Sequence, residues 1–251
     1  MKLGVVGKGG SGKTTTSALL AEAYSNAGRR VVAIDTDSNP NLGISLGFSM
    51  EQTEAVPVMP RAMMVGSRGD VTAAELIDEY GRATPAGPTL LSAIKVTEAG
   101  GGCTCGGHAT VRSLLGDALA GQDITLIDME AGIEHLSRAG GTLAHADVLI
   151  MIMEPTQKGV LTAARTVALA EELGIPRTYG LGNKAHLPAD REFFEKECAR
   201  QGVELIGVVP FDPDVLAAER AGTRVPADKA QAVRDEIHRV IHRLDELVPV
   251  G

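Results

Sequence analysis

The chain has 251 residues and a hydrophobic content of 44%, which suits a single α/β domain over residues 1–251, and 3% aromatic residues with no Trp predict an aliphatic core. A net charge of −8 and a pI near 5.3 argue against nucleic-acid and membrane-surface partners, and no apolar run is long enough to span a bilayer. Three cysteines without a secretory signal predict a reducing, cytoplasmic setting with free or metal-bound thiols.

In chain order, short apolar runs alternate with longer segments of helical periodicity. The runs that predict buried strands are Met1–Val6, Arg30–Ile34, Ile124–Ile127, Val148–Met153, Thr178–Leu181 and Glu204–Val209. The segments that predict helices are Thr15–Ala27, Thr110–Leu119, a stretch from about Lys158 to Leu173, and Asp228–Leu247. This alternation predicts a mainly parallel sheet with helices on both faces, whose ligands bind outside the carboxyl ends of the strands.

The segment between the first strand and the first helix reads GKGGSGKTT over residues 7–15 and matches the phosphate-binding pattern G-x-x-x-x-G-K-[ST]. Its glycines let backbone N–H groups face an anion, and the following helix N-terminus adds its dipole. We therefore expect a P-loop that binds a nucleoside triphosphate, with Lys13 on the β- and γ-phosphates and the Thr14 hydroxyl on Mg²⁺. The expected nucleotide contacts in the loop are Gly9, Gly10, Ser11, Gly12, Lys13, Thr14 and Thr15.

Lys8 is one lysine more than a phosphate loop needs. With it, the GKGGSGKTT segment resembles the deviant Walker A motif of the MinD/ParA/nitrogenase-iron-protein superfamily of P-loop ATPases. That resemblance implies ATP as the nucleotide and a homodimer in which Lys8 reaches the nucleotide of the partner subunit. A second cation there would offset the charge that builds up on the phosphates, so that hydrolysis is coupled to dimerisation.

Two acidic segments follow predicted strands and are similar to further motifs of this superfamily. In the first, DTDSNPNL at 35–42, the resemblance implies that Asp37 positions the attacking water and that Asp35 supports the Mg²⁺ region. The second, DMEAGIE at 128–134, resembles the Walker B motif and switch II. It implies a metal-bound water on Asp128 and a γ-phosphate contact from the Gly132 N–H. Acidic residues at strand ends also serve as ordinary helix caps.

Recognition of the base is assigned to two later segments by the same resemblance. Asn183 ends a predicted strand where the superfamily places an Asn that reads adenine. Pro210, Phe211 and Asp212 follow a later strand, where the chain of that superfamily flanks the base. Each segment could instead be an ordinary turn, because Asn, Pro and Asp all favour turns.

A second chemistry is suggested by the sequence GGGCTCGGH at 100–108. Cys103 and Cys105 lie among glycines rather than among the apolar neighbours of a core thiol, just before a predicted helix whose N-terminus favours thiolate. Thiolates select soft metals such as Ni²⁺, Zn²⁺ and Cu⁺. One pair supplies two of the four ligands of a zinc site, and a two-fold dimer would supply the others. Inert surface thiols and a redox pair are the alternatives.

Together, the phosphate loop, DTDSNPNLG, GCTCGGHATVRSLL and LIDMEAGIEHL resemble the CooC-type accessory ATPases, which mature nickel-dependent carbon monoxide dehydrogenase. The resemblance runs from Met1 to about Val215 and implies Ni²⁺ or Zn²⁺ at the dimer interface, with an apo-metalloenzyme as client. The segment Met50–Gly87 matches no motif, so its contacts stay open. Two other functions are weighed. A MinD/ParA-like positioning ATPase is disfavoured because the polar face of Asp228–Leu247 is not basic, as a membrane anchor would need, and because the chain is acidic, whereas DNA positioning needs a basic surface. An ATP-dependent electron carrier with a bridging iron–sulfur cluster is disfavoured because residues 128–134 contain no cysteine.

Several other groups have plainer expectations. His108 is either a metal ligand or a cap or solvated group at a helix start. Cys198 is expected on a helix as a core or half-buried thiol. The methionines expected to fill gaps in the core, rather than bind copper, are Met59, Met63, Met64, Met151 and Met153.

Overall fold

The computed structural model describes residues 1–59, 73–93, 121–131, 143 and 145–248. Within these residues, eight strands form one sheet in the order β3-β4-β2-β5-β1-β6-β7-β8. Neighbouring strands are parallel, except that β3 runs antiparallel to β4 at one edge. The strands are β1 Lys2–Gly7, β2 Val31–Asp35, β3 Arg82–Ala83, β4 Thr89–Ser92, β5 Ile124–Asp128, β6 Val148–Met153, β7 Thr178–Ala185 and β8 Leu205–Pro210. The predicted α/β class with a mainly parallel sheet is confirmed.

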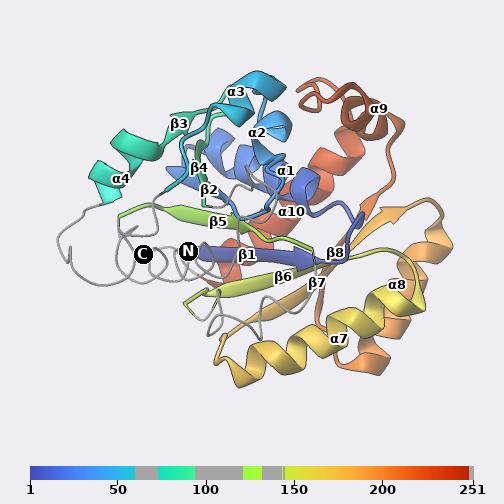
Figure 1. Ribbon diagram of the computed structural model, residues 1–251. Helices are drawn as coiled ribbons and strands as arrows, with labels where there is room; N and C mark the ends of the chain where they lie inside the picture. The colour runs from blue at the N-terminus through green and yellow to red at the C-terminus, as the bar shows by residue number, and fades with distance from the viewer. Residues whose placement is uncertain (60–72, 94–120, 132–142, 144, 249–251) are drawn as a thin grey trace, which may run out of the picture.

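Helices cover both faces of the sheet (Figure 1). They are α1 Lys13–Asn26, α2 Leu42–Ser45, α3 Met50–Glu54, α4 Ala73–Tyr80, α7 Gln157–Glu172, α8 Pro188–Gln201, α9 Pro213–Ala221 and α10 Gln231–Leu247. The strand side chains alternate between two apolar clusters: Val31 and Ala33 pack with α1 and α10, whereas Val32 and Ile34 pack with the layer of α4, α7 and α8. Strands buried on both faces explain the continuous apolar runs of the sequence.

Most predicted elements lie within one or two residues of their observed bounds, and Val148–Met153 matches β6. The strand expected at Thr178–Leu181 was placed too short, because β7 continues to Ala185 through two register shifts against β8. Asn183, expected to end a strand, therefore lies inside β7, two residues before its last residue. The predicted helix Thr110–Leu119 lies outside the described residues.

The last helix differs from its prediction at both ends. It begins at Gln231 rather than Asp228, because Lys229 N–H closes a turn on Pro226 and Ala230 is left-handed, with φ of 55°. Leu247, expected on the apolar face, is 41% exposed. The rest of that face is buried against β8 and α1, as expected, through Val233, Ile237, Val240, Ile241 and Leu244.

Glu236, assigned to the polar face of this helix from the sequence, is instead buried. Its Oε1 accepts a hydrogen bond of 2.8 Å from Val208 N on β8, an edge strand of the sheet. Two arginines donate hydrogen bonds to carbonyl groups of the same edge. Arg191 donates to Val208 O over 3.1 Å and Arg243 to Ile206 O over 2.6 Å. Side chains of α8 and α10 thus bind outward-facing backbone groups of β8.

Candidate nucleotide-binding site

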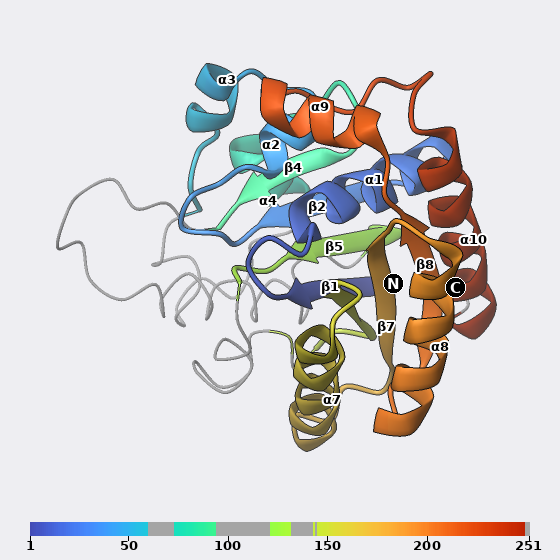
Figure 2. The same cartoon turned by 90° about the vertical axis from the view of Figure 1, so that its right-hand side faces the viewer.

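The carboxyl ends of the strands bring the predicted motifs together at one edge of the sheet. In the parallel register, Asp128 at the end of β5 pairs with Val5 on β1 and with Asp35 at the end of β2. The loop from β1 into α1 begins beside them, and β7 and β8 end on its other side (Figure 2). This edge is where ligands of open parallel sheets bind.

The loop at residues 7–12 contains a tight turn closed on the Lys8 carbonyl. The Lys8 carbonyl accepts hydrogen bonds from Ser11 N over 3.2 Å, from Ser11 Oγ over 2.9 Å and from Lys13 Nζ over 3.1 Å. Helix α1 follows from Gly12, which has φ of 92° and, having no side chain, cannot cap the helix. The first N–H groups of α1 are therefore available to an anion.

Lys13 is buried with only 7% of its surface exposed, and that burial lowers the pKa of its ammonium while Asp128 and Asp37 act in the opposite direction. Lys8, in contrast, is exposed. The two lysines of the loop thus stand in different environments: one inside the site and one on the surface beside it.

Two buried carboxyls lie beneath the loop. Asp128 accepts hydrogen bonds from the hydroxyls of Thr14 and Ser17, the latter over 2.9 Å, and burial raises its pKa to about 6. Asp35 accepts from the backbone N–H groups of Asp37 over 3.0 Å and Leu42 over 2.9 Å. Burial, with the nearby Asp128, raises the pKa of Asp35 to about 7.

This donor set fits a hard divalent cation. Carboxylate and hydroxyl oxygens are the ligands that Mg²⁺ takes, and a cation would relieve the cost of two neighbouring buried carboxyls. Thr14 and Asp128 are the groups that would hold it, directly or through water. Both carboxylate oxygens of Asp35 already accept hydrogen bonds from backbone amides. Its role is therefore to hold the loop at 35–42 and not to bind the metal.

Asp37 is half-buried above the same edge, and its Oδ1 accepts from Asn39 N over 2.9 Å. It lies close enough to Lys13 to oppose the fall in the lysine pKa. The DTDSNPNL segment is thus a chain of short turns, each closed by an aspartate: Asp35 holds Asp37, and Asp37 holds Asn39.

The residues expected to flank a base line a cavity of about 140 Å³ beside Gly12 and Thr15. Asn183 donates from Nδ2 to the Ser11 carbonyl over 2.8 Å, and a Cβ added at Gly12 would collide with its amide. Phe211 stacks on His186 with ring centroids 4.2 Å apart. Asp212 caps α9 by accepting from Asp214 N over 2.8 Å. Pro210 lies at the end of β8 on the same wall.

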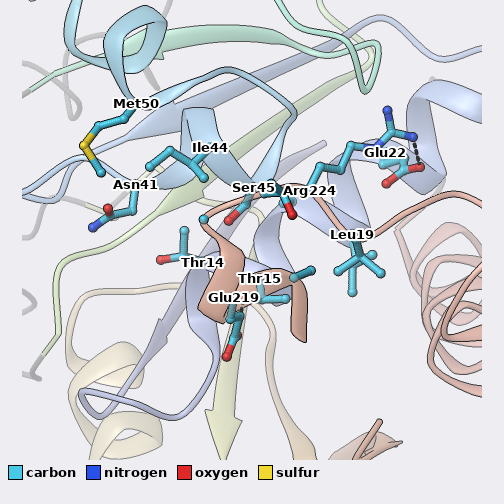
Figure 3. Close-up of a pocket in the computed structure, with 15 residues that line it drawn as sticks. Thr14, Thr15, Leu19, Glu22, Asn41, Ile44, Ser45, Met50, Glu219 and Arg224 are labelled. Atoms are coloured by element: carbon cyan, nitrogen blue, oxygen red, sulfur yellow. Dashed lines mark hydrogen bonds and ion pairs between the residues drawn. The ribbon is translucent and has the colours of Figure 1, made fainter. Parts of the chain in front are cut away.

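A larger cleft of about 340 Å³ adjoins this cavity, between α1, α2 and the α9–α10 connection (Figure 3). Thr15, Leu19 and Glu219 line both spaces, and Thr15 Oγ1 donates to Glu219 over 2.6 Å. Sequence reasoning missed Glu219, because the two partners are 204 positions apart in the chain and no local pattern links them.

Known families and proteins resemble this chain over most of its length. The profile described as "CobQ/CobB/MinD/ParA nucleotide binding domain" matches residues 5–225. The chain belongs to this family. It is 37% identical to the carbon monoxide dehydrogenase accessory protein CooC of Rhodospirillum rubrum, over 99% of this chain and 97% of that protein. It is 31% identical to an uncharacterized ATP-binding protein of Methanocaldococcus jannaschii, over 98% of each chain.

Solved structures share the fold of this family. The septum site-determining protein MinD of Pyrococcus horikoshii, complexed with Mg-ADP, matches with a TM-score of 0.72 at 19% identity, covering 99% of this chain and 97% of that one. The resemblance to CooC-type ATPases expected from four motifs therefore extends over nearly the whole chain, and the prediction of a P-loop ATPase is confirmed.

Other predicted residues of this family member fall outside the described part of the chain. They are Cys103, Cys105, His108, Gly132 and the two methionines Met63 and Met64. Among the described residues, no group of three or more His, Cys, Asp or Glu side chains is placed to hold a metal ion.

The third cysteine and the described methionines lie in the core, as expected. Cys198 on α8 is 1% exposed, and burial raises the pKa of its thiol to about 11. Met59, Met151 and Met153 are buried in the cluster on the same face of the sheet. No helix in the described ranges combines the length and the apolar character that crossing a membrane requires.

Proposed function

We propose that this chain is an ATP-dependent homodimeric metallochaperone of the cytoplasm. It would take Ni²⁺ or Zn²⁺ on the thiolates of Cys103 and Cys105 from two subunits and assist nickel insertion into carbon monoxide dehydrogenase or a related metalloenzyme. The proposal rests on one observation: similarity to the CooC accessory protein over nearly the whole length of both chains, in a sequence that carries Cys-x-Cys.

The nucleotide half of the proposal is supported by the geometry of the loop. The free amides at the start of α1 suit the phosphates of ATP, with Lys13 beside them and Mg²⁺ held through Thr14 and Asp128. Asp37 is the group proposed to orient the attacking water, and the N–H of Gly132 the one to contact the γ-phosphate.

The base of the nucleotide is proposed to bind in the cavity between β7 and α9. Because Nδ2 of Asn183 donates to the Ser11 carbonyl, its Oδ1 can accept a hydrogen bond from an amino group. Adenine presents such an amino group, so this Oδ1 suits the base of ATP. Pro210, Phe211 and Asp212 would flank the ring.

Lys8 is the residue proposed to couple nucleotide binding to dimerisation. It is exposed beside the phosphate site, and its ammonium makes no hydrogen bond or ion pair with any residue described in the structure. A cation so placed is available to the nucleotide of a second copy. Closure of two copies around ATP would also bring their Cys-x-Cys loops together and complete a four-thiolate site.

The test is metal stoichiometry measured with and without ATP. We expect one Ni²⁺ or Zn²⁺ per two chains in the wild type and none in the Cys103→Ser/Cys105→Ser variant, which should keep its ATP affinity. Cys198→Ala is the matched control, because that thiol is buried and should leave the stoichiometry unchanged. Unaltered metal content in the double variant would overturn the proposal.

The client is tested with apo carbon monoxide dehydrogenase, Ni²⁺ and ATP. The wild type should raise the activated fraction of the enzyme, and the Cys103→Ser/Cys105→Ser variant should not. Equal activation by both would show that the metal reaches the enzyme without this protein.

A further inference from the structure

We propose that Lys184 positions the phosphate loop. Its ammonium donates to the carbonyl of Gly10 on the outer side of the loop, and Glu154 accepts from the same ammonium over 3.2 Å. Lys184 lies near the end of β7, Glu154 directly follows β6, and Gly10 lies in the loop after β1. Since β1, β6 and β7 are neighbours in the sheet, one lysine ties together the ends of three adjacent strands.

The direction of these bonds decides which way the loop amides face. In a trans peptide the C=O and the following N–H point in opposite directions. Because Lys184 holds the Gly10 carbonyl, the Ser11 N–H of the same peptide points away from Lys184, where it donates to the Lys8 carbonyl over 3.2 Å. The Asn183 bond to the Ser11 carbonyl likewise points the Gly12 N–H away from Asn183. The adjacent side chains of Asn183 and Lys184 thus fix the orientation of two successive peptide units of the loop.

The backbone of Lys184 supports this role. Its φ of 57° is left-handed, a conformation that residues with a side chain adopt at a cost and that glycine adopts freely. A strained backbone at a position that carries a long cation suggests that the side chain, and not the turn, is what the site requires.

Glu154 acts through Lys184 rather than as a source of stability. Both side chains of the pair are more than a third exposed, so solvent screens their attraction. What the carboxylate adds is orientation, because a free lysine ammonium would sample many rotamers before it met the Gly10 carbonyl.

The inference requires that the protein bind a nucleotide at the phosphate loop. It does not require the metal or the client enzyme proposed above. It is tested by titrating a fluorescent ATP analogue with Mg²⁺ into metal-free protein, so that a failure of metal binding leaves the test intact. Lys184→Met should weaken nucleotide binding about tenfold, the effect of losing one charged hydrogen bond. Glu154→Gln should weaken it by about two- to fivefold. Lys196→Met, which removes an exposed lysine on α8, should bind as the wild type does.

Two further variants separate positioning from folding. In Lys184→Met/Glu154→Gln the affinity should equal that of Lys184→Met alone, because the carboxylate of Glu154 acts on the loop through the Lys184 ammonium. Lys184→Gly removes the backbone strain and should bind nucleotide as weakly as Lys184→Met while melting no lower than the wild type. Wild-type affinity in Lys184→Met or in Lys184→Gly would overturn the proposal, and additive losses in the double variant would overturn the role of Glu154.

Discussion

Ser17 donates its hydroxyl to Oδ1 of Asp128 over 2.9 Å, and this bond joins the second turn of α1 to the end of β5. Both residues are buried, with Ser17 at 0% and Asp128 at 1% exposure. The helix that presents its N-terminus to the nucleotide is thereby fixed to the strand whose last residue faces the predicted metal.

Replacing Ser17 by Ala should lower the free energy of unfolding by about 1–3 kcal/mol, since the buried Asp128 loses one of its donors. Chemical denaturation of the metal-free and nucleotide-free protein measures the change. Ser25→Ala, on the same helix and half-buried, makes the same chemical change without that partner and should cost less. Equal losses in the two variants would show that the contact with Asp128 contributes nothing.

Replacing Asp35 by Asn should reduce the turnover of ATP about tenfold or more while changing nucleotide affinity much less. An amide offers one oxygen where the carboxyl offers two, so the Asp37 or the Leu42 N–H loses its acceptor and the water-positioning segment shifts. Steady-state hydrolysis and nucleotide titration separate the two quantities.

Asp190→Asn is the matched control for that variant. Its carboxylate also accepts from two backbone amides, those of His186 and Leu187, but at the start of α8. Both of these amides reach one oxygen, Oδ2, which the single oxygen of an asparagine can replace, so Asp190→Asn should keep its stability and its turnover. Asp35→Asn should lose turnover because its two amides reach different oxygens. Equal loss of turnover in both variants would show that removal of a charge, and not of the second acceptor oxygen, causes the effect.

Acid should weaken the contact between Asp123 and Arg30. The bidentate guanidinium contact, with bonds of 2.9 and 3.3 Å, and the Arg30 N–H lower the pKa of Asp123 to about 2. A carboxyl with a depressed folded-state pKa stabilises the fold above its unfolded value near 4 and loses that effect as the pH falls toward 2.

The difference in unfolding free energy between the wild type and Asp123→Asn should accordingly be constant from pH 7 to 5 and shrink between pH 4 and 2. Denaturation curves recorded at each pH provide the comparison. A difference that grows on acidification would contradict the assignment.

Replacing Glu236 by Ala should destabilise the protein by about 1–3 kcal/mol, because the Val208 N–H at the sheet edge loses its acceptor. The variant should also aggregate sooner, since the edge of β8 then offers a free donor. Glu246→Ala, exposed on the same helix, should change neither unfolding nor light scattering.

The sequence predicted what local patterns encode and missed what distant segments bring together. The strands, α1 and the residues at strand ends followed from apolar periodicity and from Gly12, Asp35 and Asp128. Lys184 and Glu154 could not be assigned, because their partners lie in other loops of the sheet edge. The burial of Glu236 was missed for a similar reason. Helical periodicity places it on the polar face, and it cannot reveal the Val208 N–H of the edge strand that this side chain binds.

The occupied edge of β8 has a consequence for assembly. Glu236, Arg191 and Arg243 cover backbone groups of that strand, and at the opposite edge β3 offers only two residues. In the part of the chain that the structure describes, the sheet edges therefore leave few backbone groups with which a strand of a second copy could pair. Copies that meet through these residues would therefore do so through side chains and loops and not by extending the sheet.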